Sequence, residues 1–397
     1  MSFLGWRRSG IALVLTIILG ACATVPPSTD KVEQEQTQWV VSTSPGLDAL
    51  LLIGVISGDV LQAPYYAETI GFLREKMPPE SVAALDRIDQ NLRVEKKRLT
   101  GPTLVNFFSA GPTDTLDDVL RSARDPETYL KPGLMAEADW SERNYAAALQ
   151  IMPDIALALE GLKEVGLEEF YAKDTLPRLN EAIAAIEPAV SGYDLIPYHE
   201  LYLGRDLDPE IELIVVRFAH PYGIRIKGQR FLAVYHLDPD THLHVAAHEI
   251  FHPPFDRQDK ELLEKLKPLE EDPWIISIVE NRNPAFGYNS FMGLIDEDST
   301  QALDQLLAEH FDFAAEPGPR WSSRDDGMHL LAAALYHAMK EDGFAQTGGV
   351  YADWFKSALD RGLLTPEEVR RRAAEVAGQE AVQKWYDIAE EKAAAAR

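Results

Sequence analysis

The stretch DPDTHLHVAAHEIFHPPF, residues 238–255, determines how the rest of this 397-residue chain is interpreted. Asp238 can cap the free N–H groups of a first helical turn, and Pro239 suits the first helical position because it has no donor to leave unsatisfied. The double proline that follows His252 cannot continue a helix. The stretch therefore predicts a helix that begins at Pro239 and ends at His252 or just after it.

Two histidines of this predicted helix, His248 and His252, stand four residues apart. On a helix that spacing places both imidazoles on one face, in neighbouring turns. Two imidazoles so arranged can hold one Zn²⁺ at about 2.0–2.1 Å each. Glu249 directly follows the first histidine, and a carboxylate there can take a proton from a metal-bound water. The pattern predicts a zinc site with Glu249 as its catalytic general base.

A third histidine, His244, lies on the same stripe and offers an alternative pair with His248. His244 and His252 are eight residues apart, about 12 Å along a helix, so they cannot share one metal. Only the pair His248 and His252 has a carboxylate directly after its first histidine, whereas Val245 follows His244. We therefore predict that the metal ligands on this helix are His248 and His252.

The chain on either side of this helix divides by composition. Apolar residues recur with helical spacing over residues 45–205, which predicts a mostly helical N-terminal region. Residues 211–238 are rich in β-branched and aromatic side chains, which predicts two or three antiparallel strands leading into the helix. Further helical patterns follow the double proline. The expected fold class is α+β, with residues 206–397 forming the domain that carries the metal site.

Two segments near the predicted helix suggest surfaces. Residues 228–233 are the candidate for a free strand edge, which could pair with an extended peptide through backbone hydrogen bonds. Residues 316–327 contain the sequence Pro317-Gly318-Pro319. Such a turn-rich segment predicts an exposed insertion or lid.

A catalytic zinc usually takes three protein ligands and one water, so a third donor is needed after the helix. The candidates are Glu280, Asp296 and Glu297. On a helical wheel Glu297 falls nearly opposite a face of apolar and small residues. A helix wedged between core and site would show that pattern, and so would a surface helix. On this basis all three candidates stay open.

HEIFH followed by a glutamate on a later helix resembles the gluzincin arrangement of zinc metallopeptidases. More closely, the chain resembles a family of bacterial HExxH lipoproteins defined by a domain of unknown function. Their later helix carries a glutamate followed five residues on by an alanine, as Glu297 and Ala302 do here. The chain departs from that pattern at Asp296 and Gln301, where the family has asparagine and arginine. The resemblance covers most of the chain and implies a zincin-like domain with Glu297 as third zinc ligand.

Attack on a peptide carbonyl develops an oxyanion, which needs a hydrogen-bond donor. Tyr288, Tyr336 and His337 have suitable chemistry and follow the metal helix in the chain. Tyr336 and His337 lie on an alanine- and leucine-rich segment, where a core position is the more common outcome. The sequence does not choose among the three.

The N-terminus predicts an export signal. Two arginines precede an apolar run that ends at Leu19, and small residues lead from it to Cys22. This order resembles the lipobox of bacterial lipoproteins, which implies that residues 1–21 are a signal peptide and that Cys22 is lipid-modified. Residues 22–44 are polar and predict a flexible tether. The resemblance to enterobacterial lipoprotein sorting, in which an aspartate at this position has a different outcome, implies for Ala23 an anchor in the outer membrane that faces the periplasm.

The formal net charge of −26 at pH 7 argues against nucleic acid and anionic membrane surfaces as partners. A single cysteine cannot form an intramolecular disulfide, so stability must come from packing. The sequence predicts zinc-dependent hydrolysis of a peptide or protein substrate by a lipid-anchored protein of the bacterial envelope. The alternative is a non-catalytic lipoprotein that keeps the zincin scaffold as a binding or structural module.

Overall fold

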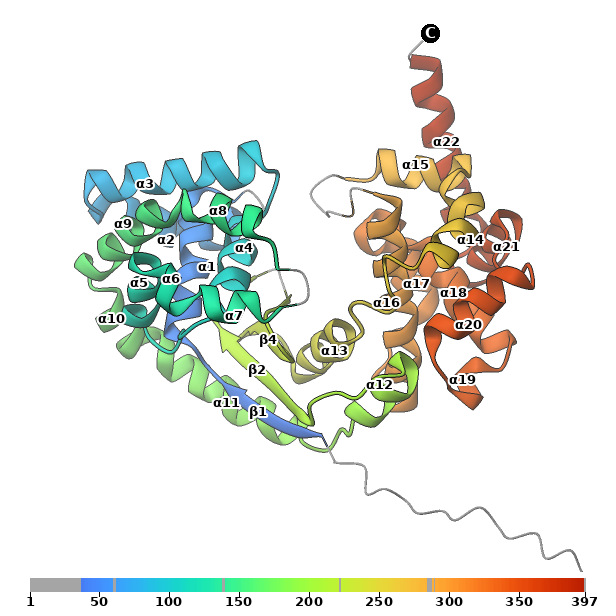
Figure 1. The fold of residues 1–397 in the computed structure, drawn as a ribbon, viewed down its shortest axis with the longest axis horizontal. Coiled ribbons are helices and arrows are strands. Elements are labelled where there is room, and N and C mark those ends of the chain that lie inside the picture. The colour runs from blue at the N-terminus through green and yellow to red at the C-terminus, as the bar shows by residue number, and fades with distance from the viewer. Residues whose placement is uncertain are drawn as a thin grey trace, which may run out of the picture. The chain divides into compact units, whose positions relative to one another are not determined.

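The computed structural model describes residues 37–59, 62–137, 140–220, 223–283, 288 and 290–395. Most of these residues are helical, and four strands form one small mixed sheet (Figure 1). The fold class is therefore α+β, as predicted. The described residues belong to one compact unit, so residues 45–205 and residues 206–395 are parts of one packed body.

The sheet has the strand order β1–β2–β4–β3, with β1 at Gln38–Ser42, β2 at Glu210–Val216, β4 at Arg230–Val234 and β3 at Ile224–Arg225. The pairs β1–β2 and β2–β4 are parallel, and among the described strands only β3 and β4 pair antiparallel. The prediction of two or three antiparallel strands is wrong for β2. The short β3 carries the chain back along the sheet, so β4 runs in the same direction as β2.

Strand β1 lies inside the segment that the sequence predicts to be a tether. Its register pairs Gln38 with Glu210, and the Trp39 indole donates a hydrogen bond to the Tyr193 carbonyl at 2.8 Å. The tether prediction is therefore wrong for the end of residues 22–44. Trp39, Val40 and Val41 favour a strand, but their backbone partners lie in a strand far later in the sequence. The first part of the predicted tether lies outside the described residues.

The predicted free edge at residues 228–233 overlaps β4, which is an interior strand. Phe231 pairs with Leu213 of β2 on one side and with Arg225 of β3 on the other. The edge prediction is wrong because both sides of β4 are already occupied. The outer strands of the described sheet are β1 and β3.

Alternate residues of β2 enter two different hydrophobic cores. Leu213 and Val215 belong to one core, and Ile214 and Val216 belong to the other. Successive side chains of a strand point to opposite faces, so this single strand supplies both cores. Because both faces of the sheet are covered, β2 reads as a nearly continuous apolar run, as buried parallel strands do.

The core that contains Ile214 is built mainly by the first ten helices, among which α1 is almost wholly buried. The helices before β2 are α1 (Pro45–Ser57), α2 (Ala63–Lys76), α3 (Pro79–Asp89), η1 (Gln90–Glu95), α4 (Thr100–Phe108), α5 (Leu116–Arg124), α6 (Pro126–Tyr129), α7 (Lys131–Met135), α8 (Glu142–Leu149), α9 (Met152–Glu164), α10 (Leu167–Phe170), η2 (Tyr171–Thr175), α11 (Leu176–Val190) and α12 (Ile196–Leu203).

The core that contains Leu213 holds α11, α12 and the helices after β4. These later helices are α13 (Pro239–Ile250), α14 (Lys260–Glu270), α15 (Pro273–Asn281), α16 (Phe291–His310), α17 (Pro317–Ser323), η4 (Arg324–Gly327), α18 (Leu330–Glu341), α19 (Phe344–Thr347), α20 (Tyr351–Asp360), α21 (Pro366–Ala377) and α22 (Gln379–Ala395).

The predicted insertion or lid at residues 316–327 contains α17 and η4. Trp321 of α17 is 1% exposed, and its indole donates to the side-chain oxygen of Gln301 at 3.0 Å. The prediction of an exposed segment is wrong for Trp321, whose buried indole packs α17 against the core. Residues 322–326 are exposed.

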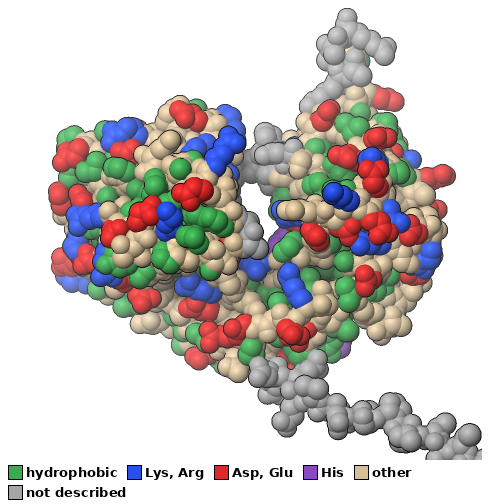
Figure 2. Space-filling model, in the orientation of Figure 1, with side chains coloured by type: hydrophobic (Ala, Val, Ile, Leu, Met, Phe, Trp, Pro, Cys, Tyr) green, Lys and Arg blue, Asp and Glu red, His purple; other side chains and the backbone are tan. Residues whose placement is uncertain are grey.

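Over the face of the molecule that Figure 2 shows, acidic and basic side chains are interspersed.

Candidate metal centre

Helix α13 forms as its local sequence predicts. The Asp238 carboxylate accepts a hydrogen bond from the Thr241 N–H at 2.8 Å, and Pro239 occupies the first turn. The helix ends at Ile250, slightly before the predicted end. The His252 N–H still bonds to the Glu249 carbonyl at 3.3 Å, so His252 completes the last turn and keeps the predicted helical spacing.

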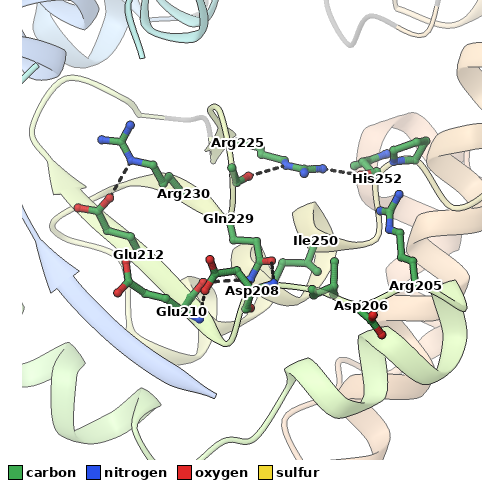
Figure 3. Close-up of a pocket in the computed structure, with 13 residues that line it drawn as sticks. Arg205, Asp206, Asp208, Glu210, Glu212, Arg225, Gln229, Arg230, Ile250 and His252 are labelled. Atoms are coloured by element: carbon green, nitrogen blue, oxygen red, sulfur yellow. Dashed lines mark hydrogen bonds and ion pairs between the residues drawn. The ribbon is translucent and has the colours of Figure 1, made fainter. Parts of the chain in front are cut away.

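The carbonyl end of α13 is held by an arginine from the neighbouring strand. Arg225 of β3 donates from Nη1 to the His252 carbonyl, as Figure 3 shows, and also to the Glu249 carbonyl at 3.1 Å. The His252 carbonyl lies beyond the end of α13, where no further helical N–H group follows it, and a cation there also complements the helix dipole. Arg225 therefore fixes the turn that carries two of the predicted site residues.

Three donor side chains converge above this turn: His248, His252 and Glu297. The two Nε2 atoms of His248 and His252 are 3.2 Å apart. The Glu297 carboxylate oxygens lie 3.5 Å from the Nε2 of His248 and 3.4 Å from the Nε2 of His252. Tetrahedral ligands at about 2.0–2.1 Å from one ion are separated by about 3.3–3.4 Å. The cluster can therefore hold a metal ion.

Each histidine is oriented by an aspartate on its other ring nitrogen. Nδ1 of His248 lies 2.8 Å from the Asp304 carboxylate, and Nδ1 of His252 lies 3.1 Å from the Asp296 carboxylate. A carboxylate only accepts hydrogen bonds, so each Nδ1 carries the proton. In the neutral imidazoles this leaves the lone pairs on Nε2, where the rings face each other and Glu297.

Two arginines in turn neutralise these aspartates. Arg320 lies 2.6 Å from Asp304, and Arg257 donates from Nε to Asp296 at 3.0 Å. Burial raises the pKa of Asp304, but the Arg320 charge and the His248 hydrogen bond outweigh it and lower that pKa. Both carboxylates therefore remain ionised and can hold the histidine tautomers.

Helix α16 explains why the wheel left Glu297 ambiguous. Both sides of this helix are buried: Glu297 is 5% exposed, and on the opposite face Ser299 accepts a hydrogen bond from the Tyr351 hydroxyl at 2.8 Å. Burial raises the pKa of Glu297, but the positive charge that the nearby imidazoles carry when protonated opposes this effect and holds the pKa well below its usual range. A buried, ionised carboxylate among imidazoles is what a metal ligand requires.

The other candidates for the third ligand lie elsewhere. Asp296 is turned to the Nδ1 side of His252, and Glu280 is exposed on α15. His244 lies on α13 beside Phe313, with ring centroids 4.8 Å apart, outside the cluster. The structure thus brings Glu297 alone of these residues to the two imidazoles.

Glu249 lies beside the cluster, as its place in the sequence predicts. Its side chain lines two cavities, and it makes no hydrogen bond or ion pair with another side chain in the part of the chain that the structure describes. Burial raises the pKa of Glu249, although the two nearby histidines oppose that effect. A carboxylate with a raised pKa and no fixed partner is suited to accept and return a proton.

Of the three predicted oxyanion donors, Tyr288 is the one at the site. It lines the cavity of about 460 Å³ that also contains His248 and Glu249. Burial and a hydrogen bond to Glu297 raise the pKa of Tyr288 well above its usual value, so its hydroxyl stays protonated. Tyr336 instead donates to Glu309, and His337 lies 2.8 Å from Glu375, so neither reaches the cluster.

Sequence reasoning missed His329, the residue that caps α18. Its Nδ1 lies 2.6 Å from the Asp298 carboxylate, and its Nε2 is buried without a hydrogen-bond partner among the described residues. Its ring packs against Tyr288 with centroids 5.5 Å apart. The sequence signal for this pair was weak. It consisted of an acidic run around Glu297 and a histidine far downstream, since Asp298 and His329 are 31 residues apart.

Comparison with family models, with curated proteins and with solved structures finds no match to this chain. Among the described residues no helix is both long and apolar enough to cross a membrane. The predicted signal peptide and Cys22 lie outside the described residues.

Proposed function

We propose that the chain is a zinc-dependent peptide hydrolase with a zincin-like catalytic domain. The observation that carries this proposal is the position of Glu249. Its carboxylate has no fixed partner and opens into the same cavity as the His248, His252 and Glu297 cluster. A purely structural metal site is closed by its ligands and needs no such carboxylate.

Zinc suits the donor set better than magnesium or calcium does. Two imidazoles and one carboxylate are the ligands of many hydrolytic zinc sites, whereas magnesium and calcium prefer oxygen donors alone. The distances between the donor atoms fit a tetrahedral ion, with the cavity of about 460 Å³ beside it for the fourth position. When bound, zinc supplies a Lewis acid that polarises a carbonyl and makes water more acidic.

The side chains of the protein would divide the remaining work. Glu249 would accept a proton from the attacking water and return it to the nitrogen of the leaving amine. Tyr288, kept protonated by its raised pKa, would donate a hydrogen bond to the oxygen on which negative charge develops. Asp296 and Asp304 would hold the imidazoles in the required tautomer throughout.

We also propose that the protein is anchored through Cys22 in the bacterial envelope, with its catalytic domain in the periplasm. The support is the basic, apolar and small-residue order before that cysteine. Peptide or protein substrates of that compartment would then reach the site, and nucleic acid would not bind a chain of net charge −26.

The decisive experiment uses Glu249→Gln in protein lacking residues 1–22. Glutamine preserves size and hydrogen bonding but accepts no proton, so hydrolysis of a broad peptide library should fall about 10²–10⁴-fold. Zinc content and the far-ultraviolet circular dichroism spectrum should match wild type. Glu75→Gln, which changes an exposed glutamate of α2, is the matched control and should retain full hydrolysis. If wild-type protein holds zinc but cleaves no peptide, the chain is the non-catalytic binding module instead.

A further inference from the structure

A second cavity lies next to the metal cluster, toward the N-terminus of α13. Its volume is about 240 Å³, and along α13 it is lined from Thr241 to Glu249. His248 and Glu249 also line the cavity of about 460 Å³, which continues to His252. The two cavities therefore follow one another along the helix and meet at the metal cluster, so an extended substrate that crosses the cluster would enter both.

Few of the side chains that line the smaller cavity are hydrophobic. Its aliphatic side chains are Val245 and Ala315, and no Phe, Tyr, Trp, Leu, Ile or Met lines it among the described residues. Pockets that recognise a hydrophobic side chain are lined mainly by large hydrophobic and aromatic side chains. Recognition in this cavity must therefore come from polar groups.

The charged groups of this cavity are almost all paired. Asp304 is bound by Arg320 at 2.6 Å, and Asp325 lies 3.7 Å from the Nε2 atom of His329. Burial lowers the pKa of His244, so that histidine is neutral at pH 7. In the proposed function Glu249 transfers a proton, so it does not bind the substrate. One cationic side chain of the lining remains to be explained.

That side chain is Arg324, at the start of η4. It lines the cavity, it is exposed, and it makes no hydrogen bond or ion pair with any residue that the structure describes. The larger cavity offers a contrast. Its arginine, Arg257, holds the Asp296 carboxylate with two nitrogen atoms and is neutralised by it. Among the described residues that line the two cavities, Arg324 of the smaller cavity is therefore the one arginine without an acidic partner.

We propose that Arg324 binds a carboxylate of the substrate, and that the enzyme prefers peptides with a negative charge next to the bond that is cleaved. This inference rests on the proposed function. A guanidinium binds a carboxylate with two parallel hydrogen bonds, which gives orientation as well as attraction. The carboxylate can come from an acidic side chain or from the free C-terminus of the substrate, and the cavity of about 240 Å³ has room for either.

The test uses alanine hexapeptides with a blocked N-terminus. One series carries glutamate at each position in turn, with the matching glutamine peptides as neutral partners and an amidated C-terminus throughout. A second pair compares the free C-terminus with its amide. Wild-type protein should favour one glutamate position, or the free C-terminus, by about tenfold in kcat/KM. The first result identifies an acidic side chain as the ligand, and the second identifies the chain end.

Arg324→Gln should abolish that preference, and Arg324→Glu should reverse it toward lysine at the same position. The control is Arg143→Gln, because Arg143 is also exposed and has no hydrogen bond or ion pair within the described chain. It should keep the wild-type preference. Equal preference for charged and neutral peptides in wild-type protein would overturn the inference, and so would a preference that survives Arg324→Glu.

The failure of the proposed function gives a different result. In that case zinc-loaded protein cleaves none of the peptides, and the inference is decided by binding. Calorimetry with zinc-loaded Glu249→Gln protein should show about tenfold tighter binding of the preferred glutamate or free-acid peptide than of its neutral partner, and Arg324→Gln should remove the difference. Equal binding of both peptides would overturn the inference without any reference to hydrolysis.

Discussion

Asp296 and Asp304 lie two turns apart on one face of α16, and each accepts a hydrogen bond from the Nδ1 atom of a different histidine of α13. Between them, Glu297 approaches the Nε2 atoms of both rings. One helix therefore supplies the third donor of the cluster and both groups that orient the other two. Each of these roles can be tested by substitution of the residue concerned.

Removal of either orienting aspartate should weaken zinc binding. Asp304→Ala and Asp296→Ala each free an imidazole to turn or change tautomer, which should lower zinc affinity about 10–100-fold. Competition with a chromogenic chelator measures the affinity. Asp114→Ala, at an exposed aspartate, is the control and should bind zinc as wild type does. Unchanged affinity in both test variants would show that the aspartates serve only the fold.

Glu297→Ala should abolish stoichiometric zinc binding, because two imidazoles alone hold the ion weakly. Elemental analysis of purified protein should give about one zinc per chain for wild type and much less for the variant. Glu280→Ala removes the other glutamate considered for this role and should retain its zinc. Loss of zinc from Glu280→Ala, with retention in Glu297→Ala, would reassign the ligand.

Tyr288→Phe should lower kcat about 100-fold while zinc content stays constant, because only a transition-state hydrogen bond is lost. Tyr336→Phe removes a phenol that bonds to Glu309 away from the cluster, so its kcat should match wild type. Steady-state kinetics on one cleaved peptide distinguishes the two. A Tyr288→Phe enzyme with wild-type kcat would exclude the phenol from the reaction.

Asp48 should make the fold less stable as the pH rises. It is 1% exposed in α1, and burial raises its pKa from 3.8 to about 7, despite hydrogen bonds from the N–H groups of Arg217 and Phe218. The folded state then binds a proton that the unfolded chain releases, so stability is present at low pH and lost between about pH 4 and pH 7. Over pH 5 to 8 the loss amounts to about 2–3 kcal/mol.

Urea unfolding of wild type and Asp48→Asn at pH 5 and pH 8 measures this contribution. Asparagine cannot ionise, so the variant should gain stability relative to wild type at pH 8 and show a smaller difference at pH 5. A stability difference that does not change with pH would mean that Asp48 does not titrate in this range.

Cys22→Ser should prevent lipid modification and block maturation of the exported chain. Labelling with a radioactive fatty acid, followed by membrane fractionation, should show a modified, membrane-bound wild type and an unlabelled variant. The Glu75→Gln control should be labelled like wild type. If Cys22→Ser matures to a soluble periplasmic protein, the N-terminus is an ordinary signal peptide.

The sequence predicts α13 and its histidine pair well because the relevant signals are local. An aspartate cap, a first-turn proline and a double proline act within a few residues of the helix they delimit. The spacing of His248 and His252 then follows from helical geometry alone. The same reasoning places Glu249 beside the pair, where the structure has it.

Features that depend on distant partners could not be predicted in this way. Strand β1 directly follows a polar segment, and its pairing with β2, such as Gln38 with Glu210, depends on residues far along the chain. The position of β4 between β2 and β3 is likewise decided by tertiary pairing. The roles of Asp304 and Arg320 likewise arise from tertiary packing, since neither stands near the histidines in sequence. Glu297 remained one of three candidates because the wheel does not reveal that both sides of α16 are covered.

The pairing of β1 with β2 imposes an order of assembly during synthesis. Thr43, next to β1, donates a hydrogen bond to the carbonyl of Val215, 172 residues further along the chain. Strand β1, which is synthesised first, therefore cannot pair until β2 has been synthesised. The core around α1 cannot be completed until β4 has been synthesised, because Leu232 and Val234 of β4 belong to it. A chain that ends before β4 would leave this apolar surface open, so we expect such a truncated chain to aggregate.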